Sequence, residues 1–288
     1  MSIPRIGTRT RRRAGLVLFY LALAVILLYI LFPFYWAFRS SIAPNNELFT
    51  TPVRYWPLHP TLEHYRQVLS DSAFQHALLN STIVAGSVTL LSLVVGALAA
   101  YALGRFSFRG RTPVLYIVLS MTMFPQIAVL GALYEMINRF GLYNSLGALI
   151  LTYLIFTLPF TVWVLSSFFQ AMPRELEEAA YVDGASPLQT FYQVLLPLAA
   201  PGLVTTGLLA FIAAWNEFLF ALSFTQTPDM HTVPVAIFTF TPQTGGGYEI
   251  PWGQMMAATI VVTVPLIVLT LIFQRRILAG LTAGAVKG

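Results

Sequence analysis

Four of the chain's 11 acidic residues lie in one short stretch, residues 173–184, where the only basic residue is Arg174. Glu175, Glu177 and Glu178 follow a proline that suits the first turn of a helix, and the helix dipole favours negative charge there. An amphipathic hairpin lying on lipid would instead favour basic residues. The acidic character therefore predicts contact with a protein partner.

The residues around these carboxylates predict a helix, a glycine turn and a second short helix. Gly184 stands where the residue after a helix adopts the left-handed conformation. Ser186 and Gln189 then form a capping-box pattern at the start of the second helix. That helix is expected to run to about Leu196, where Pro197 interrupts it. The segment is therefore predicted to be a rigid knob rather than a flexible tether.

A further carboxylate, Glu217, lies inside a long apolar run beside Asn216. A carboxylate within a membrane span costs about 2.5–3.5 kcal/mol at the bilayer centre and is a functional candidate by default. Glu217 and Asn216 are therefore candidates for a solute path or for an interhelical hydrogen bond. The alternative is a position near the membrane–water interface, which the neighbouring Trp215 fits.

The residue content excludes several kinds of chemistry. The chain has no cysteine, which excludes disulfides, thiolate catalysis and cysteine-ligated metal. No glycine-rich loop ends in Lys-Ser or Lys-Thr, so the chain cannot cradle ATP phosphates itself. The four histidines fall outside the predicted spans, and none has zinc-protease spacing. We therefore expect no cofactor in this chain.

The elements that carry these residues are predicted to be membrane helices. Hydrophobic residues make up 57% of the chain and charged residues 9%, against about 25% charged in a soluble domain. Apolar runs of about 20 residues span a hydrocarbon core of about 30 Å. The net charge of +5 gathers between these runs, so no nucleic-acid partner is expected. Six spans fit, at roughly 14–38, 78–103, 113–135, 145–169, 199–224 and 254–274.

The placement of basic residues predicts the orientation. With the N-terminus inside, twelve of the 16 basic residues fall on cytoplasmic segments and four on outer ones. Both termini are therefore expected in the cytoplasm of a multi-pass protein. The first run follows an arginine cluster but is too long for a cleaved signal peptide, so we expect a retained span.

Two further patterns concern how the spans pack. Small residues recur every fourth position along one face of the second span, which predicts close helix packing. Prolines inside three spans predict kinks. The small residues are Ser92, Gly96, Ala100 and Gly104, and the prolines are Pro125, Pro159 and Pro265.

The outer segment 225–253 contains a glycine triplet next to aromatic residues. Gly245, Gly246 and Gly247 precede Tyr248. This composition is typical of a flexible loop that reaches toward a partner. A mere connector is the alternative, which the sequence leaves open.

The acidic knob resembles the EAA loop of ABC importer permeases. That loop reads Glu-Ala-Ala, three residues, Gly, nine residues, then Ile-any-Leu-Pro, and only Val194 departs from it here. The resemblance implies that residues 170–198 form a coupling loop that docks in a cleft of a partner ATPase and receives its motion. Its expected contact residues are Glu178, Ala179, Ala180, Asp183, Gly184, Leu196 and Pro197.

The resemblance extends to carbohydrate permeases of the maltose/trehalose type, and within them to the shorter, MalG-like subunit. It rests on residues 60–65, Asn80-Ser81, residues 215–218 and the C-terminal residues 280–288. It implies the type I ABC importer permease fold: an all-α membrane protein with six transmembrane helices, in one permease domain, residues 1–288.

The same resemblance implies the assembly and its location. The expected partners are a second permease subunit, two ATPase subunits that bind ATP and Mg²⁺, an extracytoplasmic sugar-binding protein, and the lipid bilayer of a bacterial plasma membrane. It implies that the glycine-rich outer loop, Gly245 to Tyr248, contacts the binding protein. It also implies contact between the ATPases and tail residues Gly284, Val286, Lys287 and Gly288. The sugar itself stays open.

Two other classes of function would require different features inside the spans. A secondary transporter driven by an ion gradient would show an internal repeat and several intramembrane carboxylates. An intramembrane enzyme would need a paired nucleophile and base inside the spans. The predicted spans show one carboxylate away from their ends, no detectable repeat and no such pair. ATP hydrolysis is accordingly expected in partner subunits, and no enzymatic activity in this chain.

Overall fold

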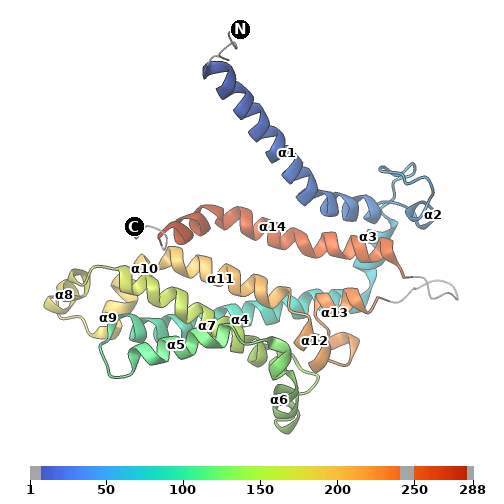
Figure 1. Cartoon of the computed structure of the whole chain (residues 1–288). Coiled ribbons are helices and arrows are strands. Elements are labelled where there is room, and N and C mark those ends of the chain that lie inside the picture. Colours follow the sequence, from blue (N-terminus) through green and yellow to red (C-terminus); the bar gives the residue numbers. More distant parts are fainter. Residues whose placement is uncertain (1–7, 241–249, 284–288) are drawn as a thin grey trace. The chain divides into compact units, whose positions relative to one another are not determined.

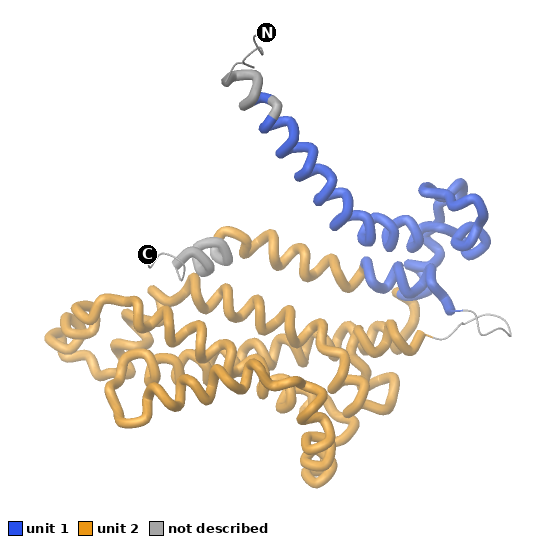
Figure 2. The backbone as a smooth tube through the Cα atoms, viewed as in Figure 1, with its two compact units in different colours: residues 1–68, 241–260 blue, residues 69–240, 261–288 orange. Residues whose placement is uncertain are grey.

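The computed structural model describes residues 8–240 and 250–283, and every regular element within them is a helix (Figure 1). The expected all-α class is therefore confirmed. The backbone divides into two compact units (Figure 2). Unit 1 comprises residues 1–68 and 241–260, and unit 2 comprises residues 69–240 and 261–288.

Unit 1 contains α1 (Thr8–Ser41), α2 (Asn45–Leu48) and most of α3 (Glu63–Ser70). Side chains of α1 are exposed along most of its apolar run. The buried Glu47 carboxylate accepts a hydrogen bond from the Leu58 amide and pairs with His59 at 2.8 Å. The hydrogen bond with His59 lowers the pKa of Glu47. These contacts fix the proline-rich segment between α2 and α3.

The first turn of α14 (Trp252–Ala283) packs against α3 within unit 1. His64 bonds the Ala43 carbonyl through Nε2 at 2.9 Å. A Cβ added at Gly253 would lie 2.3 Å from that nitrogen, so only glycine fits there. The Gln254 side chain also donates to Gln67 at 2.7 Å.

Unit 2 is built on three long helices that pack against one another: α4 (Ser72–Arg105), α7 (Leu146–Ala171) and α11 (Ala200–Trp215). The predicted small-residue face of α4 is buried, which confirms its packing role. Ser92 and Thr157 share a hydrogen bond of 2.8 Å between α4 and α7. A Cβ at Gly96 would lie 2.7 Å from Thr161, so the two helices approach to van der Waals contact.

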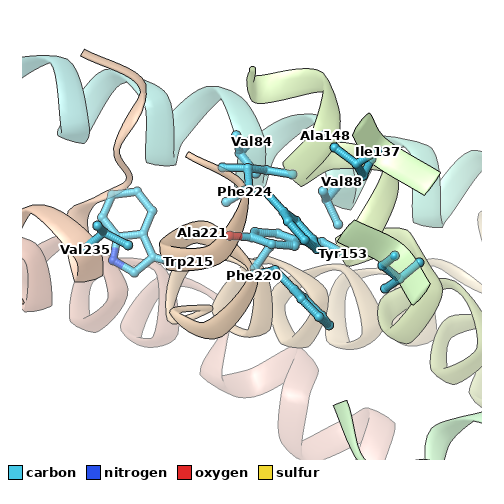
Figure 3. Packing of buried hydrophobic residues seen from close by; sticks show 14 residues of the cluster. Val84, Val88, Ile137, Ala148, Tyr153, Trp215, Phe220, Ala221, Phe224 and Val235 are labelled. Atoms are coloured by element: carbon cyan, nitrogen blue, oxygen red, sulfur yellow. The ribbon is translucent and has the colours of Figure 1, made fainter. Parts of the chain in front are cut away.

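A hydrophobic cluster joins these helices to the short helices α12 (Leu219–Phe224) and α13 (Val233–Phe238) (Figure 3). Phe220 and Phe224 of α12 stack with ring centroids 5.5 Å apart and are fully buried. Tyr153 of α7 and Val88 of α4 complete the middle of the cluster. Burial of this apolar surface ties the segment after α11 to the three-helix core.

Within the described residues, four unbroken helices are long and apolar enough to span a membrane, and two bent helix pairs bring the number to six if each pair is one span. The unbroken ones are in α1, α4, α7 and α14, and α7 and α14 run through their prolines. The third span differs from prediction: α5 (Arg111–Thr122) and α6 (Gln126–Arg139) meet at 95°. Pro125 is the N-cap of α6 and starts a new helix rather than kinking one. The predicted fifth span also differs, since α11 ends at Trp215 and α12 is separate.

Candidate functional site

The predicted knob begins with α8 (Glu175–Val182), which ends in a glycine turn. Gly184 has a φ of 83°, which confirms the expected left-handed conformation. Its amide donates to Tyr181 O at 3.0 Å, and the Ala185 amide donates to Ala180 O at 2.9 Å. These two bonds form a Schellman motif, which satisfies the last carbonyls of α8 and fixes the direction of the exit.

The second half of the knob starts with the expected capping box on α9 (Pro187–Thr190). The Ser186 amide donates to Gln189 Oε1 at 2.7 Å, and the Gln189 amide donates to Ser186 Oγ at 3.3 Å. The helical path then continues through a π-helical turn at Phe191–Leu195 into α10 (Leu196–Leu198). Pro197 therefore lies within the helical path, and the interruption expected there is wrong. The helical path bends by 77° before α11 instead.

The two halves of the knob enclose a groove of about 580 Å³. The predicted contact residues Ala179, Ala180, Asp183 and Gly184 line it, together with Glu175, Leu176, Ala185, Gln189, Gln193 and Val194. Glu178 is exposed on α8 outside this lining, as is Pro197 on α10, while Leu196 is half-buried. The structure thus gathers four of the seven predicted contact residues in one groove.

Exposed apolar side chains lie on the same knob. Val182 is 87% exposed and Leu188 55% exposed. Apolar side chains beside carboxylates on a rigid surface are suited to a protein interface, whereas lipid headgroups would favour basic residues.

Sequence reasoning missed Arg105 and Tyr101, which hold this knob from the end of α4. Arg105 pairs with Glu177 of α8, and Tyr101 donates to Pro187 O. Both partners lie more than 70 positions away in sequence. The sequence did carry one sign of this pairing. Tyr101 and Arg105 are four positions apart, so they share one face of a helix, next to the small residues Ala100 and Gly104.

Two groups of predicted contact residues lie outside the described residues. They are Gly245 to Tyr248 in the glycine-rich loop, and Gly284, Val286, Lys287 and Gly288 in the tail. Within unit 2, residues 225–240 of the predicted outer segment are held by side chains of α4 and of the residues just before α7. Asn80 donates to Asp229 O at 2.7 Å, Ser81 accepts from the Val233 amide, and Asn144 Oδ1 accepts from the Gln226 and Thr227 amides.

Glu217 lies in the break between α11 and α12, away from the knob. Its two carboxylate oxygens accept from the amides of Phe220 and Ala221 at 2.8 and 3.1 Å. The carboxylate therefore caps the N-terminus of α12. Asn216 is exposed and donates to Ile212 O at 2.8 Å. A role for either residue in a solute path stays a prediction.

The knob, the helical breaks and the apolar helices fit one family of membrane proteins. The family described as "binding-protein-dependent transport system inner membrane component" matches residues 92–282, which include the whole knob. The chain belongs to this family. It is a family of transport permeases, not of catalytic subunits. The assignment supports the predicted ABC permease over the alternative, a secondary transporter driven by an ion gradient.

Individual relatives agree with this assignment over nearly the full length of the permease. It is 45% identical to the trehalose/maltose transport system permease protein MalG of Thermococcus litoralis, covering 90% of this chain and 92% of that one. It is 44% identical to the trehalose transport system permease protein SugB of Mycobacterium tuberculosis, covering 90% and 93%.

A solved bacterial ABC transporter involved in alginate import contains a chain of the same fold. The TM-score is 0.80 at 21% sequence identity, covering 95% of this permease and 99% of that chain. The expected type I ABC importer permease fold is therefore confirmed.

Proposed function

We propose that this permease is the MalG-like subunit of an ABC importer for a trehalose- or maltose-like sugar. Its similarity at 44–45% identity to permeases of trehalose and maltose systems supports this substrate class. With a second permease it forms the sugar pathway across a bacterial inner membrane. Both of its termini face the cytoplasm.

The observation that carries this proposal is the rigid coupling loop, residues 170–198, with its Schellman turn and capping box. A rigid element can transmit a push from a partner, whereas a flexible one would absorb it. In this account the loop docks on one of two ATPase subunits, which bind ATP and Mg²⁺. Glu178 to Ala180, Asp183, Gly184, Leu196 and Pro197 form its contact surface.

Two further contacts belong to the same proposal. Gly245, Gly246, Gly247 and Tyr248 meet an external sugar-binding protein. Gly284, Val286, Lys287 and Gly288 lie against the ATPase pair. The flanking anchors at Asn80, Ser81 and Asn144 support the first contact, because they hold the segment that leads to the glycine triplet.

A thiol-to-lysine cross-linking experiment tests the docking. The chain has no cysteine, so Val182→Cys introduces a single thiol on the exposed knob. We expect this variant to cross-link to the ATPase in membranes. The matched control is Val53→Cys, at a position where the native residue is 60% exposed. Val53 lies between the first and second predicted spans, on the side opposite the cytoplasmic N-terminus, so this variant should give no adduct. An adduct from position 53 alone would contradict the proposed docking.

A further inference from the structure

The guanidinium of Arg105, at the last residue of α4, is buried against the start of the coupling loop. Its side chain is 4% exposed, and that of its partner Glu177 is 12% exposed. Arg105 Nε donates to Glu177 Oε2 at 2.7 Å, and one Nη contacts the same oxygen at 2.5 Å. The α8 helix is therefore tied to α4 by a buried, charge-assisted contact.

The remaining donors of Arg105 hold the linker between α7 and α8. They reach the carbonyls of Phe169 at 3.1 Å, Met172 at 2.8 Å and Pro173 at 3.3 Å. Carbonyls at the end of a helix have no partner within it. One planar guanidinium thus satisfies the end of α7, fixes the linker and pairs with α8 at once, which an ammonium could not do.

Tyr101 makes the corresponding contact with the second half of the coupling loop. It lies one turn before Arg105 on α4, on the same face. Its hydroxyl donates to Pro187 O at 3.2 Å, and its ring packs 4.9 Å from that of Phe191. The last two turns of α4 therefore hold both helices of the loop.

The α4 and α7 backbones also approach closely at this point. A Cβ at Gly104 would lie 3.0 Å from Phe169 Cβ and 3.2 Å from Ser166 O. The end of α4 therefore packs directly against the end of α7. Because Arg105 ties α8 to this same end of α4, the three helices contact one another at one place.

We propose that Arg105 is a positioning residue for energy coupling, which transmits motion of the coupling loop to α4 through Glu177 and the α7–α8 linker. This inference rests on the proposed docking of the loop on an ATPase. The alternative is that Arg105 only stabilises the fold or fixes the topology of the chain. The number of substrate molecules imported per ATP hydrolysed distinguishes a coupling role from a purely stabilising one. Loss of folded protein lowers the rates of uptake and of ATP hydrolysis equally, so it leaves this number unchanged.

The test uses the full transporter, with its binding protein, in vesicles, and measures uptake per ATP at equal amounts of assembled complex. We expect Arg105→Ala to lower this ratio roughly tenfold, because α8 then loses its buried, charge-assisted contact with α4. Arg105→Lys should also lower it. Glu177→Ala should lower it, and the double variant should be no worse than Arg105→Ala alone, since the pair acts as a unit.

The matched control is Arg139→Ala. Arg139 also pairs with a glutamate, Glu135, but the two side chains are 76% and 66% exposed. Its ratio should equal that of the wild type, because exposed pairs contribute little. A wild-type ratio for Arg105→Ala would overturn the inference. If that variant fails to assemble, Glu177→Gln, which keeps the contacts of Arg105 with the linker, decides: a lowered ratio supports the inference, and a wild-type ratio overturns it.

The cross-link from Val182→Cys separates this inference from the proposed docking. The Val182→Cys cross-link is measured with and without Arg105→Ala. If it forms in both transporters, and Arg105→Ala leaves uptake per ATP at the wild-type value, only the role of Arg105 fails. If no cross-link forms in either, the docking itself fails, and the inference fails with it.

Discussion

Both carboxylate oxygens of Glu217 accept hydrogen bonds from amides in the first turn of α12, those of Phe220 and Ala221. The break after Trp215 creates the need for such an acceptor, because a new helix begins with unpaired N–H groups. This capping role explains the carboxylate of Glu217 by local structure. This role needs no contact with sugar, and it differs from the solute-path role in a measurable way.

Replacing Glu217 separates the two roles. If capping is its function, Glu217→Ala should lower the free energy of unfolding by about 1 kcal/mol, because a helix cap is lost. Glu217→Gln keeps an acceptor oxygen and should lose less. Thermal unfolding in detergent and sugar uptake at low temperature are measured for both. Unchanged unfolding with abolished uptake in both variants would show instead that the charge serves the solute path.

At the scale of the helix, α4 and α7 depend on glycine at their closest approach. Gly96→Ala places a Cβ 2.7 Å from Thr161 and should lower the unfolding temperature. Gly86→Ala is the matched control, the same substitution in the same helix with nothing within 4 Å of the new Cβ. Alanine favours the helix by about 1 kcal/mol over glycine, so this control should be neutral or stabilising. Equal destabilisation by both would argue against close packing.

The helical elements could be predicted from sequence where local chemistry determines them. Gly184 and the box of Ser186 with Gln189 depend on neighbours within four residues, so their motifs were readable. The small-residue face of α4 was readable because its period matches the helix. The EAA pattern, with seven fixed positions between Glu178 and Pro197, predicted the family because all of its positions lie in one loop.

Other features could not be predicted because their causes lie far away in the chain. In the sequence, Arg105 is only one of the twelve basic residues that predict topology, because its partner Glu177 is 72 positions away. Pro125 permits both a kink and a full break, and the packing of the two helices it separates decides which. The π-helical turn at Phe191–Leu195 has no composition of its own, and its buried ring contacts with Tyr101 and Phe169 are tertiary.

At the scale of the whole molecule, the proposed function requires the coupling loop and the α2–α3 segment to face opposite sides of the membrane. Single cysteines at Gln189 and at Val53 test this, since both native residues are exposed. We expect an impermeant thiol reagent added outside intact cells to label position 53 only. Labelling of position 189 from outside would exclude docking on a cytoplasmic ATPase.

The central claim is that the rigid coupling loop transmits the work of an ATPase, and Gly184 tests it most directly. Gly184 has positive φ and nothing within 4 Å of a built Cβ, so a substitution strains the backbone without a clash. A left-handed residue costs about 1–2 kcal/mol, and a β-branched side chain is disfavoured further. The strain would re-aim α9 relative to α8, while insertion and span packing are expected to survive.

Two matched variants accompany Gly184→Val in this measurement. Gly184→Asn tolerates positive φ and should keep most of its function. Gly110→Val carries a similar strain in another turn, with φ 93° and open space around it, but outside the coupling loop. Sugar uptake, ATP hydrolysis and membrane content are measured in the assembled transporter. The account predicts that Gly184→Val alone abolishes uptake at normal membrane content, whereas wild-type uptake by Gly184→Val would contradict the coupling role of this loop.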